Sequence, residues 1–229
     1  DTYEDAWARG YRDLQPANQY NVDYSLAGTA RIEHLLRRIR NGMAGAGMFV
    51  ESAKGECNLG QHEVAFRFAE ALTTCDNHVL YKTGAKEIGQ RFSIMPSFMA
   101  KWSALYPGCS GHIHQSLSDG KKNLFFDAKA NRSMSPLFES YLAGQVACLM
   151  EFAPLFWPTI NSYKRLVDGF WAPVKPTWGV DNRTASFRVI AGSPKATRLE
   201  TRCPGADVNP YLAMAAVIAS FSWRARSMA

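Results

Sequence analysis

The sequence predicts an α+β fold, in which a curved, mostly antiparallel sheet carries polar and charged side chains on its inner face and helices pack outside. Short segments alternate apolar and other residues, as Val64, Phe66 and Phe68 do, and this pattern indicates strands. Longer segments such as residues 70–90 show helical spacing with few helix breakers. With 229 residues and 47% hydrophobic content, the chain is long enough for one large domain or two small ones.

The first 50 residues lead to the segment around which the chain is organised. Residues 1–29 are rich in Tyr, Asp, Asn and Gly, so we expect irregular structure there. Ser25 or Thr29 can cap a helix that ends among the glycines of residues 42–47. Its apolar face consists of Ile32, Leu35, Leu36, Ile39 and Met43. Residues 48–50 then begin a strand.

Residues 55–63 contain two glutamates, Glu56 and Glu63, with Gly60 between them. Gly60 permits a sharp turn, so the segment can fold into a hairpin in which the two carboxylates face each other. Facing carboxylates repel each other unless a cation lies between them, which indicates a hard-metal site with oxygen ligands. The alternative is a polar hairpin with exposed charges, a common surface feature.

The middle of the chain combines one helix with two further strands. Residues 70–90 form the predicted helix, and residues 92–99 and 108–117 have the pattern of strands. Side chains two residues apart on a strand point to the same side. We therefore expect His112 and His114 to lie on a common face of the second strand.

The C-terminal half contains two long helices. The first covers residues 135–152, with Pro136 in its first turn. Residues 161–180 contain Pro and Gly throughout and are predicted to form an ordered loop. Asp207 is placed to cap a final apolar helix over residues 211–223.

Residues 182–190 and 198–202 are predicted to form the remaining strands. One face of the last strand carries three charged side chains, namely Arg198, Glu200 and Arg202. Arg183 and Arg188 are an odd number of residues apart, so a regular strand would point them to opposite faces. Both can reach one ligand only if the strand bulges or begins after Arg183.

Separate elements thus offer metal-compatible ligands, which are Glu56, Glu63, His112 and Glu200. Carboxylates with an imidazole suit Mg²⁺ or Mn²⁺ that also binds phosphate oxygens. Planar guanidinium groups that clamp phosphate or carboxylate are supplied by Arg165, Arg183, Arg188, Arg198 and Arg202. The combination indicates phosphoryl transfer. Taken singly, His112 is also explained as a hydrogen-bonded core histidine and Glu200 as part of an ion-pair ladder.

Charge and composition exclude several other classes of protein. The net charge is +6 and the pI about 9.1, but the basic residues are spread along the chain and no nucleic-acid motif accompanies them. The five cysteines are scattered and never spaced Cys-x-x-Cys, so neither a disulfide framework nor a zinc cluster is indicated. We find no apolar run of 18 residues and no signal-peptide pattern. We expect a cytoplasmic protein that binds neither membrane nor nucleic acid.

Five motifs, in this order and spacing, resemble the catalytic domain of glutamine synthetase from about residue 48 to 216. They are Gly60-Gln61-His62-Glu63, Gly111-His112-Ile113-His114-Gln115-Ser116-Leu117, Asn161-Ser162-Tyr163-Lys164-Arg165, Asp181-Asn182-Arg183-Thr184-Ala185-Ser186 and Arg198-Leu199-Glu200-Thr201-Arg202. The resemblance implies that the γ-carboxylate of glutamate attacks the terminal phosphate of ATP. Ammonia then attacks the resulting acyl phosphate.

The resemblance also implies roles for the residues of these motifs. Glu56 and Glu63 would bind the metal ion nearer the substrate, and His112 and Glu200 the ion that grips the ATP phosphates. Arg165 would hold the glutamate carboxylate.

The same resemblance places further basic side chains around the phosphates. Arg202 would contact the substrate or the transferred phosphoryl group. Arg183 and Arg188 would face the nucleotide phosphates, with His114 and Ser116 nearby.

Two features of the family lie outside this sequence. In the family, a strand with two acids completes the metal sites, and a small β domain precedes that strand. We therefore expect residues 1–229 to be a single, partial catalytic domain without these two parts. Family members form rings of identical subunits, so the resemblance implies a homo-oligomer for the full-length protein.

One loop position departs from the family pattern. Glutamine synthetases usually have a Glu at the position of Trp171, which closes over the substrate and helps to take a proton from ammonium. The Trp171 ring is uncharged, but it can contact an alkylammonium through a cation–π interaction. We hypothesise that the acceptor is a larger amine, with ammonia still open. The alternatives are that Trp171 only packs the loop, or that the chain is a non-catalytic relative of the family.

Overall fold

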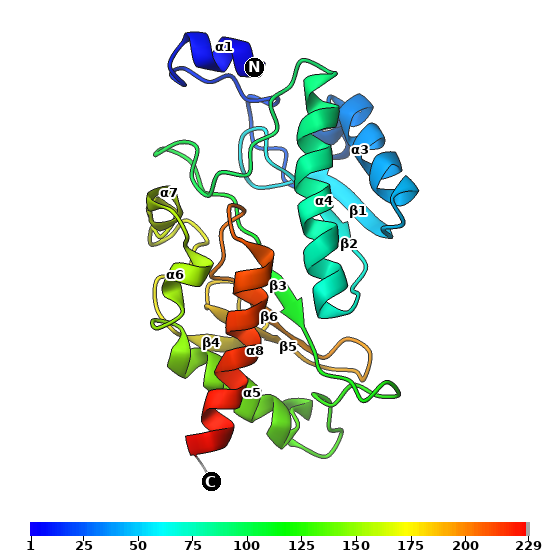
Figure 1. Ribbon diagram of the computed structural model, residues 1–229, viewed down its shortest axis with the longest axis vertical. Coiled ribbons are helices and arrows are strands. Elements are labelled where there is room, and N and C mark those ends of the chain that lie inside the picture. The colour runs from blue at the N-terminus through cyan, green and yellow to red at the C-terminus, as the bar shows by residue number, and fades with distance from the viewer. Residues whose placement is uncertain (228–229) are drawn as a thin grey trace. The chain divides into compact units, whose positions relative to one another are not determined.

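The computed structural model describes residues 1–227 and divides into two compact units, which we describe separately (Figure 1). Unit 1 covers Asp1–Phe98 and unit 2 begins at Met99. Helices and mostly antiparallel strands make up both units, so the predicted α+β class is confirmed, with the strands divided between two sheets. No helix within the described residues is long and apolar enough to cross a membrane.

Unit 1 packs two helices against a β-hairpin. Its helices are α1 (Tyr3–Ala8), α2 (Leu26–Ala30), α3 (Glu33–Gly45) and α4 (Ala71–Gln90). Its strands are β1 (Val50–Gly55) and β2 (His62–Phe66), which pair antiparallel. The core consists of Leu35, Ile39, Met43, Met48 and Ala85, from α3, α4 and the segment before β1. Apolar residues at helical spacing on α3 thus bury one face, as predicted.

Three details of unit 1 differ from the prediction. Residues 1–29 contain α1, because Thr2 and Asp5 form a capping box, and also α2. Ser25 caps α2 and not the longer α3. Residues 92–99 form no strand, because the chain turns back at the end of α4, where the Ile94 amide donates to the Gly89 carbonyl oxygen at 3.1 Å.

Unit 2 is a four-stranded sheet covered by helices. The strands are β3 (Ile113–Gln115), β4 (Trp178–Val180), β5 (Phe187–Ile190) and β6 (Arg198–Thr201), in the order β3-β6-β5-β4, with only the β4–β5 pair parallel. The helices are α5 (Pro136–Cys148), α6 (Ala153–Phe156), α7 (Ile160–Lys164) and α8 (Pro210–Ser227), with a short 3₁₀ turn η1 (Asn131–Ser133) before α5. Figure 1 shows α5 and α8 side by side.

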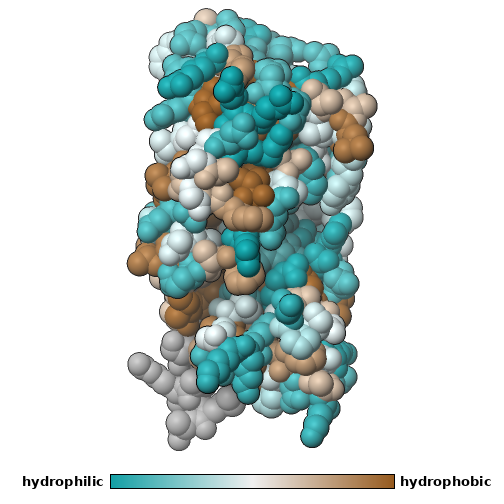
Figure 2. Space-filling model, turned by 90° about the vertical axis from the view of Figure 1, so that its right-hand side faces the viewer, coloured by the Kyte–Doolittle hydropathy of each residue, from teal (hydrophilic) through white to brown (hydrophobic). Residues whose placement is uncertain are grey.

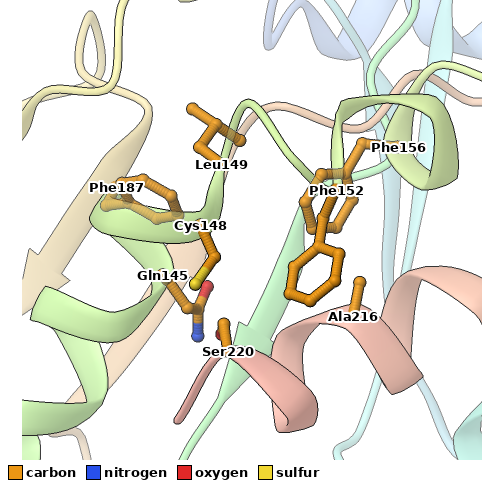
Figure 3. Close-up of a pocket in the computed structure, with 8 residues that line it drawn as sticks. All are labelled: Gln145, Cys148, Leu149, Phe152, Phe156, Phe187, Ala216 and Ser220. Carbon is orange, nitrogen blue, oxygen red and sulfur yellow. The ribbon is translucent and has the colours of Figure 1, made fainter. Parts of the chain in front are cut away.

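The core of unit 2 lies between α5, α8 and one face of the sheet. Phe187 and Leu199 point from β5 and β6 into this layer and meet Phe138 of α5 and Val217 of α8. Figure 3 shows the place where α5, α6, α8 and β5 meet, with Gln145, Phe152 and other side chains around a narrow space. That space has no room for a water molecule, so it is part of the packed core and not a binding site.

Several bounds in unit 2 also differ from the prediction. The helix expected over 135–152 ends at Cys148, and a separate α6 follows it. The loop expected over 161–180 contains α7 and β4. Only three residues of the strand expected over 108–117 pair as β3. The helix cap is also different, because Asn209 and not Asp207 accepts the first backbone N–H groups of α8.

Large apolar side chains remain exposed in both units, among them Leu26, Phe68 and Ile160. On the face shown in Figure 2, hydrophobic residues form separate patches among hydrophilic ones. Scattered exposed apolar residues are normal for folded proteins and do not by themselves mark a binding site.

Candidate active site

The segment with two glutamates forms the predicted hairpin in unit 1. Gly60 has φ +63°, and a Cβ there would lie 2.9 Å from the Ala17 nitrogen, so glycine is required on both counts. The Glu56 amide donates to the Gln61 carbonyl oxygen at 3.0 Å, which closes the turn directly after β1. Lys54 and Glu63 are direct cross-strand partners in the β1–β2 pair. The hairpin therefore brings Glu56 and Glu63 to one place.

A lysine ammonium joins the two carboxylates. Lys54 Nζ donates to Glu56 Oε1 and, at 3.1 Å, to Glu63 Oε2. Burial and the hydrogen bond with Glu56 raise the pKa of Glu63. Burial also acts to raise the pKa of Glu56, but the hydrogen bond from Lys54 holds it below its ordinary value. The pair already holds one cation, and its oxygen donors fit a hard divalent ion at the same place.

In unit 2, Glu200 is the centre of a second charged cluster. It lies on β6, opposite His114 of β3 and Arg188 of β5, and its side chain is only 3% exposed. Arg202 Nη1 lies 2.6 Å and Arg188 Nη1 3.1 Å from its carboxylate oxygens. Burial acts to raise the pKa of Glu200, but the hydrogen bond from His112 and the nearby cations hold it well below its ordinary range. Glu200 is therefore a buried carboxylate that stays ionised.

His112 has one ring nitrogen bound and the other unpartnered. Its Nδ1 lies 3.1 Å from Glu200 Oε1, so we assign the proton to Nδ1. Nε2 is buried and has no hydrogen-bond partner among the described residues. Burial lowers the pKa of His112 to about 4, so the ring is neutral at neutral pH. A neutral imidazole held by a carboxylate through its other nitrogen is the arrangement of a metal-ligating histidine, and His112 fits that role.

His114 lies on the same side of the strand as His112, as the two-residue spacing predicted. Its Nε2 is 3.7 Å from Glu200 Oε1, and its Nδ1 accepts a hydrogen bond from Arg198 Nε at 3.0 Å. Burial lowers the pKa of His114 as well. Arg198, Glu200 and Arg202 thus lie on one side of the last strand, as predicted.

Arg165 is a buried cation that forms no ion pair within the part of the chain that the structure describes, although the charge of Asp207 acts on it from further away. It is 2% exposed, and its guanidinium donates to the carbonyl oxygens of Cys203 at 2.8 Å and Arg202 at 3.2 Å. Burial lowers the pKa of Arg165 to about 10, so it remains charged at neutral pH. Because an unpaired buried charge is costly, the position fits an anionic ligand group.

The structure also locates the remaining predicted residues. Arg183 is exposed in the turn before β5, so the strand does begin after Arg183, which was one of the two arrangements that the spacing allowed. Arg188 also pairs with Asp181 at 2.7 Å. Ser116 is exposed directly after β3, and Trp171 is 55% exposed with φ +60°.

Two lysines in these surroundings were not identified from the sequence. Lys54 lies on β1, two residues before Glu56, and this spacing was the signal that could have identified it. Lys101 is buried, donates to the Tyr106 carbonyl oxygen at 2.5 Å and lies 4.3 Å from the Phe170 ring centroid. No short-range pattern identifies Lys101, because Tyr106 accepts its hydrogen bond through a backbone carbonyl group, which any residue offers, and Phe170 lies far along the chain.

The structure thus brings the predicted residues together in two groups. Unit 1 brings together Glu56 and Glu63, and unit 2 brings together His112, Glu200 and the arginines around them. No group of three His, Cys, Asp or Glu side chains that could hold a metal ion occurs within residues 1–227. Each group is a partial donor set of the type that binds Mg²⁺ or Mn²⁺.

Comparison with known proteins identifies the family. The family model "Glutamine synthetase, catalytic domain" matches residues 2–222. The gamma-glutamylethanolamide synthetase GlnA4 of Streptomyces coelicolor is 56% identical over 96% of this chain and 47% of its own length. The type-1 glutamine synthetase 2 of Dictyostelium discoideum is 45% identical over 93% of this chain and 41% of its own length.

A solved structure described as a GmaS/ADP complex has a similar fold. It superimposes with a TM-score of 0.81 at 29% identity and covers 93% of this chain and 51% of that chain. The chain thus spans about half the length of the relatives it matches. The family model covers both units and all five sequence motifs. The chain therefore belongs to the family defined by the glutamine synthetase catalytic domain.

Proposed function

We propose that this chain belongs to an ATP-dependent ligase that joins the γ-carboxylate of glutamate to ammonia or a small amine. In the first step a carboxylate oxygen attacks the terminal phosphorus of ATP, and ADP leaves. In the second step the uncharged nitrogen attacks the acyl carbon of γ-glutamyl phosphate, phosphate leaves, and the nitrogen loses one proton. The observation that carries the proposal is the buried cluster of Glu200, His112, Arg188 and Arg202 in a chain of this family.

The metal ligands we propose are Glu56 and Glu63 for one ion and His112 and Glu200 for the other. The support is the facing pair of carboxylates in the hairpin and the Nε2 of His112, which has no partner among the described residues. Because Glu200 contacts the other nitrogen of this ring, the two side chains can bind one ion only after that contact breaks. Bound Mg²⁺ or Mn²⁺ would supply charge neutralisation for the phosphates. The protein's own contribution is to hold its donors ready, with Glu200 kept ionised by its basic neighbours.

Arg165 is proposed to bind a carboxylate of glutamate. Its guanidinium is already fixed by the backbone carbonyl groups of Arg202 and Cys203, so its position does not depend on the substrate. An anionic substrate would supply the direct ion-pair partner that Arg165 lacks among the described residues. Fixed cations of this kind bind without reorganisation.

The basic residues around Glu200 are proposed to serve the phosphates. Arg202 has a buried Nε without a partner among the described residues, which leaves one N–H available for the substrate or the phosphoryl group. Arg188 and the exposed Arg183 are proposed to face the nucleotide phosphates, with His114 and Ser116 beside them. Guanidinium groups suit this role because they bind phosphate oxygens with two N–H donors.

The acceptor is proposed to be an amine larger than ammonia. Trp171 is exposed, and its loop neighbour Phe170 contacts the Lys101 ammonium. An exposed ring can contact an alkylammonium through cation–π attraction of about 0.5 to 2 kcal/mol. The similarity to a gamma-glutamylethanolamide synthetase makes ethanolamine the first acceptor to test.

We also propose three properties of the whole protein. Residues 1–229 are proposed to be part of one catalytic domain, because a single family model spans both compact units. The full-length protein is proposed to be a homo-oligomer and to work in the cytoplasm. Both follow from the family and the composition of the chain.

The test is glutamate-dependent release of ADP with Mg²⁺ or Mn²⁺, comparing ammonium, methylamine, ethanolamine and a polyamine. It is run with this chain and with a chain extended at its N-terminus to the length of its relatives. We expect turnover to be fastest with an alkylamine, and we expect Trp171→Glu to shift the preference toward ammonium. If ammonium is the best acceptor and Trp171→Glu changes nothing, the amine proposal is wrong. If the extended chain binds ATP but turns over no acceptor, a non-catalytic relative is the better reading.

A further inference from the structure

Lys54 occupies a particular place in the hairpin. It extends from β1 opposite Glu63, and its ammonium contacts Glu56 and Glu63 together. On another side the ammonium lies 4.6 Å from the centroid of the Tyr24 ring. Three groups that attract cations, two carboxylates and a ring face, therefore surround one lysine nitrogen.

A divalent ion at the same two carboxylates would compete with this lysine. Lys54 donates to Glu56 Oε1 and Glu63 Oε2, and these oxygen atoms are among the donors that Mg²⁺ or Mn²⁺ requires. An ammonium and a metal ion cannot both lie within bonding distance of one pair of carboxylates without strong mutual repulsion. Binding of the ion therefore has to exchange one cation for the other.

We propose that Lys54 sets the metal affinity of this site by competing with the divalent ion for Glu56 and Glu63. The ammonium holds the two carboxylates together, and it has to leave both of them when the ion binds. The Tyr24 ring offers it a second contact that does not depend on the carboxylates. This proposal rests on the proposed role of Glu56 and Glu63 as metal ligands.

The proposal predicts how substitutions of Lys54 change the affinity for Mn²⁺. Removing the ammonium removes both the competitor and a positive charge a few ångströms from the ion, and both changes favour the ion. We therefore expect Lys54→Met to bind Mn²⁺ at least about tenfold more tightly than the unchanged chain at low ionic strength. Lys54→Arg keeps the charge and the donors, so its affinity should stay within a few fold of the original.

The experiment is a titration with Mn²⁺ of the chain extended at its N-terminus to the length of its relatives, in which the electron paramagnetic resonance signal of the free ion is followed. The unchanged chain in each comparison is this extended chain without a substitution. The matched control is Arg40→Met, which removes one positive charge from another ion pair of unit 1, that of Arg40 and Glu33. This control should leave the Mn²⁺ affinity unchanged. Equal tightening in Lys54→Met and Arg40→Met would attribute the effect to net charge and overturn the proposal.

A second measurement does not depend on the titration. Without Mn²⁺, Lys54→Met should unfold at a lower temperature than the unchanged chain, because two close carboxylates lose their shared cation. Added Mn²⁺ should then raise the unfolding temperature more in Lys54→Met than in the unchanged chain. Lys54→Gln, which removes the charge and keeps a hydrogen-bond donor, should behave in the same way and replaces Lys54→Met if that variant does not fold.

Failure of this inference and failure of the proposed metal site give different results. Glu63→Gln should abolish the Mn²⁺ binding that depends on the hairpin. If Glu63→Gln abolishes binding but Lys54→Met binds Mn²⁺ equally or more weakly, the competition is refuted and the metal site stands. If Glu63→Gln leaves Mn²⁺ binding unchanged, or neither the unchanged chain nor Lys54→Met binds Mn²⁺, both proposals are wrong.

Discussion

At Glu200, one buried carboxylate meets the side chains of Arg188, Arg202 and His112. The ion pairs are nearly enclosed by protein, so their energy differs from that of a surface salt bridge. Removing one partner from such a group leaves the others buried with no counter-ion, and this costs more than the pairs contribute as a set. Glu200 therefore contributes both to the stability of unit 2 and to the charge of its candidate site.

The first prediction concerns Glu200→Gln, which removes the negative charge and keeps the shape. We expect it to lower the free energy of unfolding of unit 2 by about 3 to 5 kcal/mol, because Arg202 and Arg188 lose their shared anion. The measurement is urea unfolding followed by tryptophan fluorescence. Asp181→Asn is the control, since Asp181 is an exposed partner of Arg188 and its loss should cost less than about 1 kcal/mol. Equal effects of the two changes would contradict this account.

The second prediction concerns His78 of α4, whose Nε2 is buried without a hydrogen-bond partner among the described residues. Burial lowers the pKa of His78 from 6.5 to about 4. Between these pH values the unfolded chain binds a proton and the folded chain does not, so stability falls as the pH is lowered from 6.5 toward 4. The contribution is at most about 3 kcal/mol. His78→Gln should flatten this pH dependence in urea unfolding, and an unchanged slope would refute the assignment.

At the residue scale, the spacing of side chains along strands and the glycine in the turn predicted much of the candidate site. The two-residue spacing placed His112 and His114 on one face, and Gly60 predicted the turn that brings Glu56 to Glu63. The positions of Lys54 and Lys101 were missed. A lysine on a strand is most often a solvated surface residue, and only the fold shows which anions, carbonyl groups and rings surround its nitrogen.

At the element scale, the hairpin depends on Gly60 in two ways, and these can be separated. Gly60 and Gly120 both have positive φ, but only at Gly60 would a Cβ meet backbone atoms, whereas at Gly120 it would meet open space. The third prediction is that Gly120→Ala costs about 1 kcal/mol from backbone strain alone and Gly60→Ala clearly more. Thermal unfolding compares the two variants.

The same hairpin variant has a functional consequence. Gly60→Ala should also weaken Mn²⁺ binding, because a distorted turn separates Glu56 from Glu63, whereas Gly120→Ala should not. If Gly60→Ala were as mild as Gly120→Ala in both measurements, the turn would not be what positions the two carboxylates.

The long, strongly patterned elements were predicted well, and the short ones were not. Helix α3 follows from its apolar spacing, whereas α4 and α8 follow from long stretches that contain few helix breakers, with Pro210 in the first turn of α8. Residues 92–99 have a strand-like pattern but turn back on the end of α4, since Phe92 and Ile94 pack against the core of unit 1. Tertiary packing decides such short apolar segments, and the local sequence does not reveal it.

At the scale of the whole molecule, each unit has its own core, and the core of unit 2 is the larger. The fourth prediction is that urea unfolding is not a single transition, because unit 1 has less buried apolar area to stabilise it. Trp7 is the only tryptophan of unit 1, so fluorescence reports mainly unit 2, whereas far-UV circular dichroism reports the helices of both. The dichroism signal should begin to change at a lower urea concentration than the fluorescence. Coincident curves would show one cooperative unit.

The Glu56–Glu63 pair and the cluster around Glu200 also differ in how many chain segments must come together to form them. Glu56 and Glu63 meet within one hairpin, whereas Glu200 meets His112 and His114 only after β6 has paired with β3, where Leu199 lies opposite Gln115. Bringing distant segments together costs chain entropy before any contact compensates for it. We therefore expect the hairpin to form early in folding and the cluster around Glu200 late. If the residues around Glu200 bind phosphate as proposed, a newly synthesised chain would gain this ability only at the end of folding, and incompletely folded molecules should not capture nucleotide.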